Sequence, residues 1–273
     1  MDLKVTLIQS ELHWESATDN LVMFSEKINA ITEKTDLIVL PEMFNTGFSM
    51  QSELLSETME GETVAWMLAQ AKKTDAAIVG SLIVAADDTF YNRLIWVEPS
   101  GEIQTYDKRH LFRMANEHAH FTGGTERLII TYKGWRICPL VCYDLRFPIW
   151  ARNKKLSVDK NRTAEQPEHS ETAYDLLIYI ANWPEVRKTP WRKLLEARAI
   201  ENQCYVVGVN RVGLDGKSFS YSGNSVVVDP KGEPISHLPE SQNCTETMSI
   251  SLDELNAFRS IFPVGMDADE FVL

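Results

Sequence analysis

Short, nearly unbroken apolar runs, separated by polar segments, constrain the possible folds of this chain more than any other feature. Residues 37–40, 76–84 and 137–141 form three of these runs, each too short for most helices. Runs of this kind are typical of strands that are buried on both faces. Such strands need covering layers on each side, which favours a layered α/β fold.

The segments between these runs predict helices and hairpins. Three segments have helical patterns: 18–32, 63–73 and 191–203. Three glycine-containing turns join strand-like segments into hairpins: 99–101, 133–134 and 229–232. Hairpins join antiparallel strands, so we expect mixed rather than purely parallel sheets. We find no repeat or linker, which predicts one domain over residues 1–273, with the charged segment 154–172 as a surface loop.

Charge and cysteine content exclude several classes of protein. The net charge is −12 and the basic residues form no cluster, which argues against a nucleic-acid partner. The N-terminus lacks the features of a signal peptide, and no apolar stretch approaches the ~20 residues that span a bilayer. We therefore expect a cytoplasmic protein without a membrane partner. Four cysteines in 273 residues do not make a disulfide framework, so they should be free thiols.

Three predicted strands are each followed at once by a chemically capable side chain. Glu42 follows the first run, Lys108 follows residues 103–107, and Cys142 follows the run that ends at Val141. Taken singly, each has a structural explanation: a core cysteine, a solvated carboxylate or a surface cation. Ligand sites of α/β proteins gather beyond the carboxyl ends of strands, so the three together favour a functional site.

These residues lie in segments that resemble a known family. The segments LPEMFNTGF (40–48), YDKRHLF (106–112) and PLVCYDLRFP (139–148) are similar, in this order, to the three signatures of the nitrilase superfamily of carbon-nitrogen hydrolases. Four further segments extend the resemblance over nearly the whole chain and make it strongest to the bacterial omega-amidases: NEH (116–118), ANWP (181–184), ARAIENQCYV (197–206) and NRVG (210–213).

The resemblance implies a fold and an activity. The fold is a four-layer αββα sandwich with mixed sheets, which commonly forms homodimers through its helical faces. The catalytic triad is Glu42, Lys108 and Cys142, with Glu117 as a second acidic residue, and no metal or organic cofactor is implied. Omega-amidases hydrolyse the terminal amide of small 2-oxo dicarboxylic acid monoamides such as 2-oxoglutaramate and 2-oxosuccinamate. Nitrile, N-carbamoyl amine and general aliphatic amide hydrolysis use the same triad and stay open.

The residue types fit amide hydrolysis, which needs a nucleophile, a proton carrier and a group that stabilises the oxyanion. A free thiol and a free glutamate differ by about 4 pKa units, or roughly 6 kcal/mol for proton transfer. We expect burial to raise the pKa of Glu42 and the ammonium of Lys108 to lower that of Cys142. A helix from about Asp144 would add positive potential, and the backbone N–H of Tyr143 would join Lys108 at the oxyanion.

Other side chains near the signatures are candidates for binding the substrate. Arg146 lies four residues after Cys142 and could hold a carboxylate in a bidentate clamp, although an ion pair with an acidic neighbour is an equal alternative. Phe44 and Trp183 are candidates for lining the pocket, although buried aromatic residues are more often core.

Competing interpretations of the motifs are weaker. His110, His118 and His120 invite a metal-hydrolase hypothesis, but no HExxH motif is present and the cysteines lack the pairing of a structural zinc site. The papain-type cysteine motif is also missing. A binding protein on the same scaffold without activity is disfavoured because all three triad residues are kept.

Overall fold

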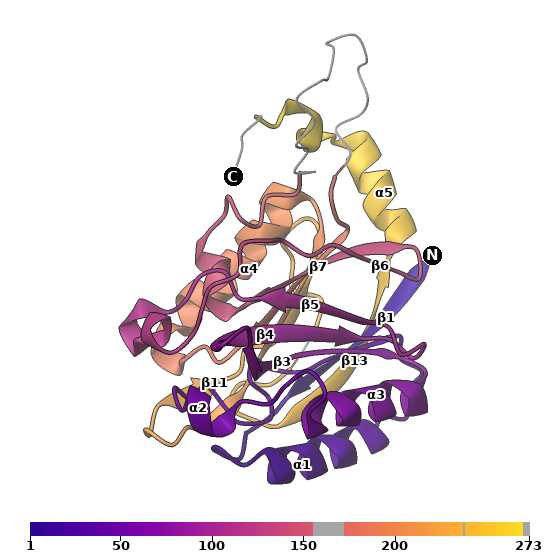
Figure 1. Cartoon of the computed structure of the whole chain (residues 1–273). Coiled ribbons are helices and arrows are strands. Elements are labelled where there is room, and N and C mark those ends of the chain that lie inside the picture. Colours follow the sequence, from indigo (N-terminus) through magenta and orange to yellow (C-terminus); the bar gives the residue numbers. More distant parts are fainter. Residues whose placement is uncertain (155–171, 237, 270–273) are drawn as a thin grey trace.

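The computed structural model describes residues 1–154, 172–236 and 238–269 (Figure 1). Its core contains two sheets. The larger is six-stranded, in the order β13 (Cys244–Ser251), β1 (Asp2–Gln9), β2 (Leu37–Val39), β3 (Ala77–Ala86), β4 (Thr89–Val97) and β5 (Ile103–Asp107). The smaller is five-stranded, in the order β12 (Val226–Val228), β9 (Tyr205–Asn210), β8 (Leu176–Ala181), β7 (Trp135–Val141) and β6 (Ile130–Tyr132). A separate ribbon pairs β10 (Val212–Leu214) with β11 (Ser220–Ser222).

Both sheets are mixed, as the hairpin signals predicted. β1, β2 and β3 are parallel, and so are β7, β8 and β9, whereas the outer strands pair antiparallel. The hairpin between β6 and β7 turns at Lys133 and Gly134, whose φ angles are 47° and 80°. Two consecutive positive φ angles suit the two-residue turn that matches strand twist.

Alternating side chains of the larger sheet pack in two different layers. Leu37 and Val39 of β2 face the core between the sheets, whereas Ile38 packs with the helices on the opposite face. Those helices are α1 (Ala17–Asn29) and α3 (Glu62–Thr74), which lie together beneath the sheet in Figure 1. Because successive side chains of a strand point to opposite faces, this one strand contributes both to the inter-sheet core and to the layer packed against the helices.

The smaller sheet is covered by α4 (Lys188–Asn202), whose Trp191 and Leu195 pack against Gly208 of β9. A side chain at Gly208 would collide with both residues, so glycine permits this close approach. The order of layers is helices, sheet, sheet and helix, which confirms the predicted αββα sandwich. The short α2 (Ser52–Leu55) and the C-terminal α5 (Leu252–Ile261) complete the α-helices of the described chain.

One local prediction is wrong. No α-helix begins at Asp144; a single 3₁₀ segment, η3 (Cys142–Arg146), starts at the cysteine itself. Its C-cap is Phe147, with ψ 88°, and Pro148 follows. A residue that precedes proline avoids the helical region, so the segment stops at Arg146. The helix dipole expected near Cys142 is correspondingly small.

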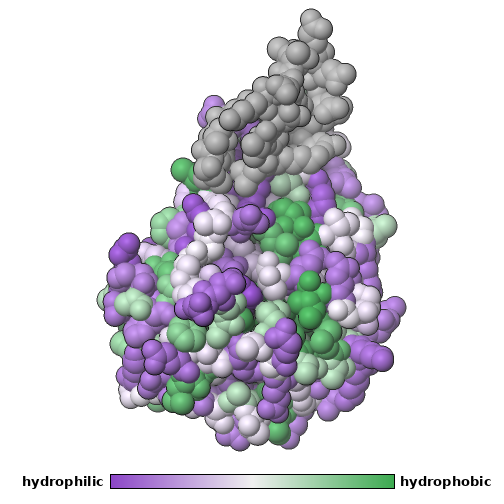
Figure 2. Space-filling model, in the orientation of Figure 1, coloured by the Kyte–Doolittle hydropathy of each residue, from purple (hydrophilic) through white to green (hydrophobic). Residues whose placement is uncertain are grey.

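Two further predictions concern the surface. Apart from its end residues, the expected loop 154–172 lies outside the described residues. Within the described ranges, no helix has the length and apolar character that crossing a membrane requires. On the face drawn in Figure 2, hydrophobic side chains are interspersed with hydrophilic ones.

Candidate active site

Two strand ends and a 3₁₀ segment, η2 (Glu117–Ala119), bring the two predicted carboxyl groups and the ammonium together. Glu42 follows β2 closely and Lys108 follows β5 directly. Lys108 Nζ lies 2.9 Å from Oε1 of Glu42 and 2.9 Å from Oε1 of Glu117. All three side chains are completely buried. The fold therefore joins residues separated by up to 75 positions in one ion-pair cluster (117 − 42).

Cys142 lies in a strained turn at the end of β7. Its φ is 44°, in the left-handed region that residues other than glycine rarely occupy. Such strain is kept where surrounding contacts impose it, often at functional sites. Its Sγ lies 4.0 Å from the carbonyl oxygen of Asn182, and the residue is 9% exposed. Glu42, Lys108 and Glu117 all act electrostatically on the Cys142 thiol, which places the sulfur beside the ion-pair cluster.

Two asparagines that sequence reasoning missed hold the carboxylates in place. Asn92 Nδ2 donates to Oε1 of Glu42 at 2.8 Å and to Oε1 of Glu117 at 3.3 Å. The backbone N–H of Asn182 donates to the other Glu42 oxygen at 2.8 Å. Asn182 directly follows β8, so the strand-end rule could have found it. Asn92 lies inside β4, next to Arg93, where the strand-end rule does not apply.

A buried carboxylate, Asp144, connects the lysine loop to the cysteine turn. It accepts hydrogen bonds from the Val141 backbone N–H at 3.1 Å and from the Tyr106 hydroxyl at 2.7 Å. Its second oxygen lies 2.7 Å from Nδ1 of His110, whose backbone N–H also donates to it. Because these partners flank Cys142 and Lys108, Asp144 fixes the two catalytic segments relative to each other.

The electrostatics of the cluster differ from the prediction for the thiol. Burial raises the pKa of Cys142 well above its usual value, Glu42 raises it further, and the opposing effect of Lys108 is smaller. Burial would lower the pKa of Lys108, but Glu117 and Glu42 together raise it. Burial also raises the pKa of Glu117, against the pull of Lys108. Lys108 does pull the pKa of the thiol down, but the expected net lowering is wrong, because desolvation is the larger effect.

This result constrains how the thiol can become a nucleophile. Loss of its proton to water would add a negative charge to a buried cluster that already holds two carboxyl groups. Transfer of the proton to Glu42 leaves the charge of the cluster unchanged. The arrangement favours a neutral thiol at rest and proton transfer to Glu42 during attack. Cys138, four residues earlier in β7, is also a buried thiol, and burial raises its pKa to about 12.

The predicted substrate-binding residues divide into two groups. The Tyr143 ring packs edge-on against Phe112, with centroids 5.0 Å apart, and the Arg146 guanidinium lies 5.2 Å from the Trp183 ring centroid. Phe44 does not belong with them, because its ring packs between Phe24 and Trp66 in the helix-facing layer. Phe44 is therefore a core residue, directed to the opposite face of the sheet from the inter-sheet core.

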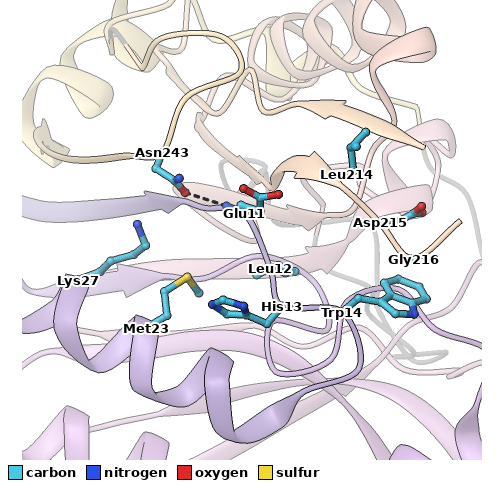
Figure 3. A pocket seen from close by; sticks show the side chains of 10 residues that line it. All are labelled: Glu11, Leu12, His13, Trp14, Met23, Lys27, Leu214, Asp215, Gly216 and Asn243. Carbon is cyan, nitrogen blue, oxygen red and sulfur yellow. Dashed lines mark hydrogen bonds between the residues drawn. The ribbon is translucent and has the colours of Figure 1, made fainter. Parts of the chain in front are cut away.

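A cavity of about 570 Å³ lies elsewhere, at the carboxyl end of β1 (Figure 3). Its lining comes from the loop after β1, from α1, from Leu214 to Gly216 and from Asn243, and includes none of the catalytic candidates. Figure 3 shows Lys27 and Trp14 on its two sides. His110, His118 and His120 do not converge: in the described parts of the chain, no three His, Cys, Asp or Glu side chains gather as a metal-binding group.

Comparison with known proteins identifies the family. Residues 4–260 match the carbon-nitrogen hydrolase family. The chain is 44% identical over 271 residues to Omega-amidase YafV from Escherichia coli (strain K12), covering 99% of this chain and 98% of that protein. It is 29% identical over 272 residues to 2-oxoglutaramate amidase from Bacillus subtilis (strain 168), covering 98% of each.

A solved structure agrees with both the fold and the family. The crystal structure of XC1258 from Xanthomonas campestris, a CN-hydrolase superfamily protein with an arsenic adduct in its active site, superposes with a TM-score of 0.93. The two proteins are 42% identical, and the match covers 100% of this chain and 99% of that one. The chain belongs to the carbon-nitrogen hydrolase family, the nitrilase superfamily that its three sequence segments predicted.

Proposed function

We propose that this protein is an omega-amidase, which hydrolyses the terminal carboxamide of short 2-oxo dicarboxylic acid monoamides to the acid and ammonia. The observation that carries the proposal is the buried cluster of Glu42, Lys108 and Glu117 beside the Cys142 thiol. The similarity to proteins named Omega-amidase YafV and 2-oxoglutaramate amidase supports the choice of substrate.

In the first half-reaction, Glu42 accepts the thiol proton while the sulfur attacks the carboxamide carbon. Two donors are assigned to the oxyanion: one N–H of Lys108 and the backbone N–H of Tyr143. Tyr143 lies in the first turn of η3, where backbone donors have no partner within the helix. Glu42 then gives the proton to the departing nitrogen, so that ammonia leaves and a thioester remains on Cys142.

In the second half-reaction, water hydrolyses the thioester. Glu42 takes a proton from the water as its oxygen attacks the acyl carbon, and the proton returns to the sulfur as the acid leaves. Glu117 acts through Lys108, whose ammonium it holds at 2.9 and 3.0 Å. Every proton that moves in this cycle passes through Glu42, so the scheme requires no further acid or base.

Recognition of the distal carboxylate is assigned to Arg146. Its side chain is exposed and, within the described residues, forms no ion pair, which disfavours the alternative of a structural salt bridge. The guanidinium lies over the ring face of Trp183. This contact leaves the N–H donors at the edge of the guanidinium free for a bidentate contact with a carboxylate.

The other parts of the proposal concern the environment of the enzyme. A reducing cytoplasm would keep the nucleophilic thiol free. A homodimer through the α4 face is supported by the exposed Ile200 of α4 and Ile149 near η3, which are 55% and 59% exposed. Light scattering should give twice the chain mass, and Ile200→Asp should shift that mass toward the monomer.

An ammonia-release screen tests the activity itself. The substrates are 2-oxoglutaramate, 2-oxosuccinamate, pentanamide, an N-carbamoyl amine and a simple aliphatic nitrile, compared by kcat/KM. The proposal requires the two 2-oxo acid amides to be the best substrates. If the nitrile or pentanamide is best, the substrate assignment is wrong, whereas the catalytic cluster is unaffected.

A further inference from the structure

Two arginines near the catalytic cysteine lack anionic partners. Neither the Arg146 nor the Arg187 guanidinium has an ion pair or hydrogen-bond acceptor among the residues that the structure describes. Other arginines of this chain do, such as Arg93 with Asp107 and Arg259 with Asp175. Arg187 is half-buried, and a partly desolvated cation without an anion is costly unless a ligand supplies the anion.

Both guanidiniums rest on aromatic rings next to the catalytic residues. Arg187 lies 5.4 Å from the centroid of Phe112, whose ring contacts that of Tyr143, the residue after Cys142. Arg146 lies 5.2 Å from the centroid of Trp183, the residue after Asn182, whose carbonyl is 4.0 Å from the cysteine sulfur. The Arg187–Phe112 contact is thus connected to the cysteine through Tyr143, which follows the end of β7. The Arg146–Trp183 contact is connected to it through Asn182, which follows the end of β8.

Trp183 contacts both arginines. Its ring face lies under the guanidinium of Arg146, and its indole N–H donates to the backbone carbonyl of Arg187 at 2.7 Å. The same ring therefore positions one guanidinium directly and fixes the backbone that carries the other. Within this arrangement, the two cations belong to one rigid unit rather than to two independent surface positions.

We propose that Arg187 is a specificity-determining residue that binds the 2-oxo group of the substrate while Arg146 binds its carboxylate. This inference rests on the omega-amidase function proposed above. A 2-oxo acid presents three acceptor oxygens in one plane, two from the carboxylate and one from the ketone. One bidentate guanidinium satisfies the carboxylate, and a second satisfies the ketone oxygen together with the nearer carboxylate oxygen.

The pair of cations also explains how the enzyme would reject an abundant analogue. Glutamine has the same chain length and terminal amide as 2-oxoglutaramate, but an ammonium group replaces the ketone. That ammonium would face Arg187, and like charges in a partly desolvated site repel. Arg187 thus favours the 2-oxo acid by attraction and excludes the 2-amino acid by repulsion.

A matched substrate series tests this role, because only carbon 2 changes between 2-oxoglutaramate (ketone), glutaramate (methylene) and glutamine (ammonium). Pentanamide, without a carboxylate, reports on the chemistry alone. We expect Arg187→Met to lower kcat/KM for 2-oxoglutaramate by about tenfold or more, the loss of a charged hydrogen bond. Glutaramate should lose less, and glutamine should lose nothing or gain.

Two variants serve as comparisons. Arg146→Met should lower kcat/KM for 2-oxoglutaramate and glutaramate by the same factor, because both carry the carboxylate. Arg192→Met removes an arginine of the following helix, α4, that faces Glu240 at 3.8 Å, and should leave all ratios unchanged. Circular dichroism and thermal unfolding of each variant establish that it is folded.

The outcomes separate this inference from the proposed function. If the unmodified enzyme prefers pentanamide or a nitrile, the omega-amidase function itself is wrong. If it prefers 2-oxoglutaramate, but Arg187→Met changes the three acids by one common factor or not at all, Arg187 does not bind the 2-oxo group. A selective loss for 2-oxoglutaramate supports the assignment.

Discussion

Lys108 Nζ lies 2.9 Å from Oε1 of Glu42, and neither side chain is exposed to solvent. A buried ion pair of this kind needs further hydrogen bonds to offset the loss of hydration. Asn92, Asn182 and Glu117 supply them. The result is a carboxylate held in fixed geometry beside a thiol, which is the feature that the proposed catalysis requires.

Replacing the nucleophile should abolish turnover without unfolding the protein. Cys142→Ala removes a sulfur that packs at a strand end, so we expect ammonia release to fall below detection and the unfolding curve to change little. Cys244→Ala, which removes a thiol at the first residue of β13, is the matched control and should retain full activity. Substantial amide hydrolysis by Cys142→Ala would rule out the thioester scheme.

The raised pKa of Cys142 predicts how this thiol reacts with iodoacetamide. Only the thiolate is alkylated, and a raised pKa means that its fraction is small at neutral pH and grows as the pH increases. The alkylation rate of the free enzyme should therefore keep rising beyond about pH 8.5, the usual thiol pKa, without a plateau. Mass spectrometry of the Cys142 peptide measures this rate. A plateau below pH 7 would instead indicate a resting thiolate paired with Lys108.

Glu117 should affect catalysis through the position of Lys108. Glu117→Gln keeps the shape of the side chain but weakens the contacts at 2.9 and 3.0 Å to the ammonium. Small displacements of a catalytic group can lower rates by about a hundredfold, so we expect kcat to fall tenfold to a hundredfold. KM should change little, because Glu117 does not bind the substrate. A fall in kcat of the folded variant together with an equally large rise in KM would instead place Glu117 in the substrate pocket.

Phe44→Leu distinguishes a core role from a binding role. Phe44 is completely buried and packs between Phe24 and Trp66. The smaller side chain should cost about 1–2 kcal/mol in the free energy of unfolding. Denaturant titration measures this loss, while KM of the folded enzyme should stay the same. A raised KM with unchanged stability would return Phe44 to the pocket.

The sequence predicted those parts of the molecule that local patterns encode. The apolar runs and glycine turns predicted the mixed sheets, because burial on both faces and positive φ angles leave direct marks in the residue types. By contrast, β13 was missed because it lies at the sheet edge and carries alternating polar residues, CTETMSIS, that do not read as a buried strand. The following helix α5 was missed with it.

Within the site, residues at strand ends were predictable and their electrostatics were not. Glu42, Lys108 and Cys142 each follow a strand closely, so their positions, together with the family resemblance, marked them. The direction of the thiol pKa shift depends on the burial of Cys142, which no local pattern reveals, and burial outweighs Lys108. Asn92 and Asp144 contribute through contacts with segments 25 and 34 or more positions away, which only the folded chain brings together.

The central claim is that amide hydrolysis passes through a thioester on Cys142, and partitioning with hydroxylamine tests it most directly. The enzyme is given the primary amide and the methyl ester of the same acid, each with the same hydroxylamine concentration, and the ratio of hydroxamate to free acid is measured. A shared acyl-enzyme predicts one ratio for both substrates, because the leaving group has departed before either acceptor attacks. Ratios that differ with the leaving group would mean that water attacks the substrate directly, which contradicts this account.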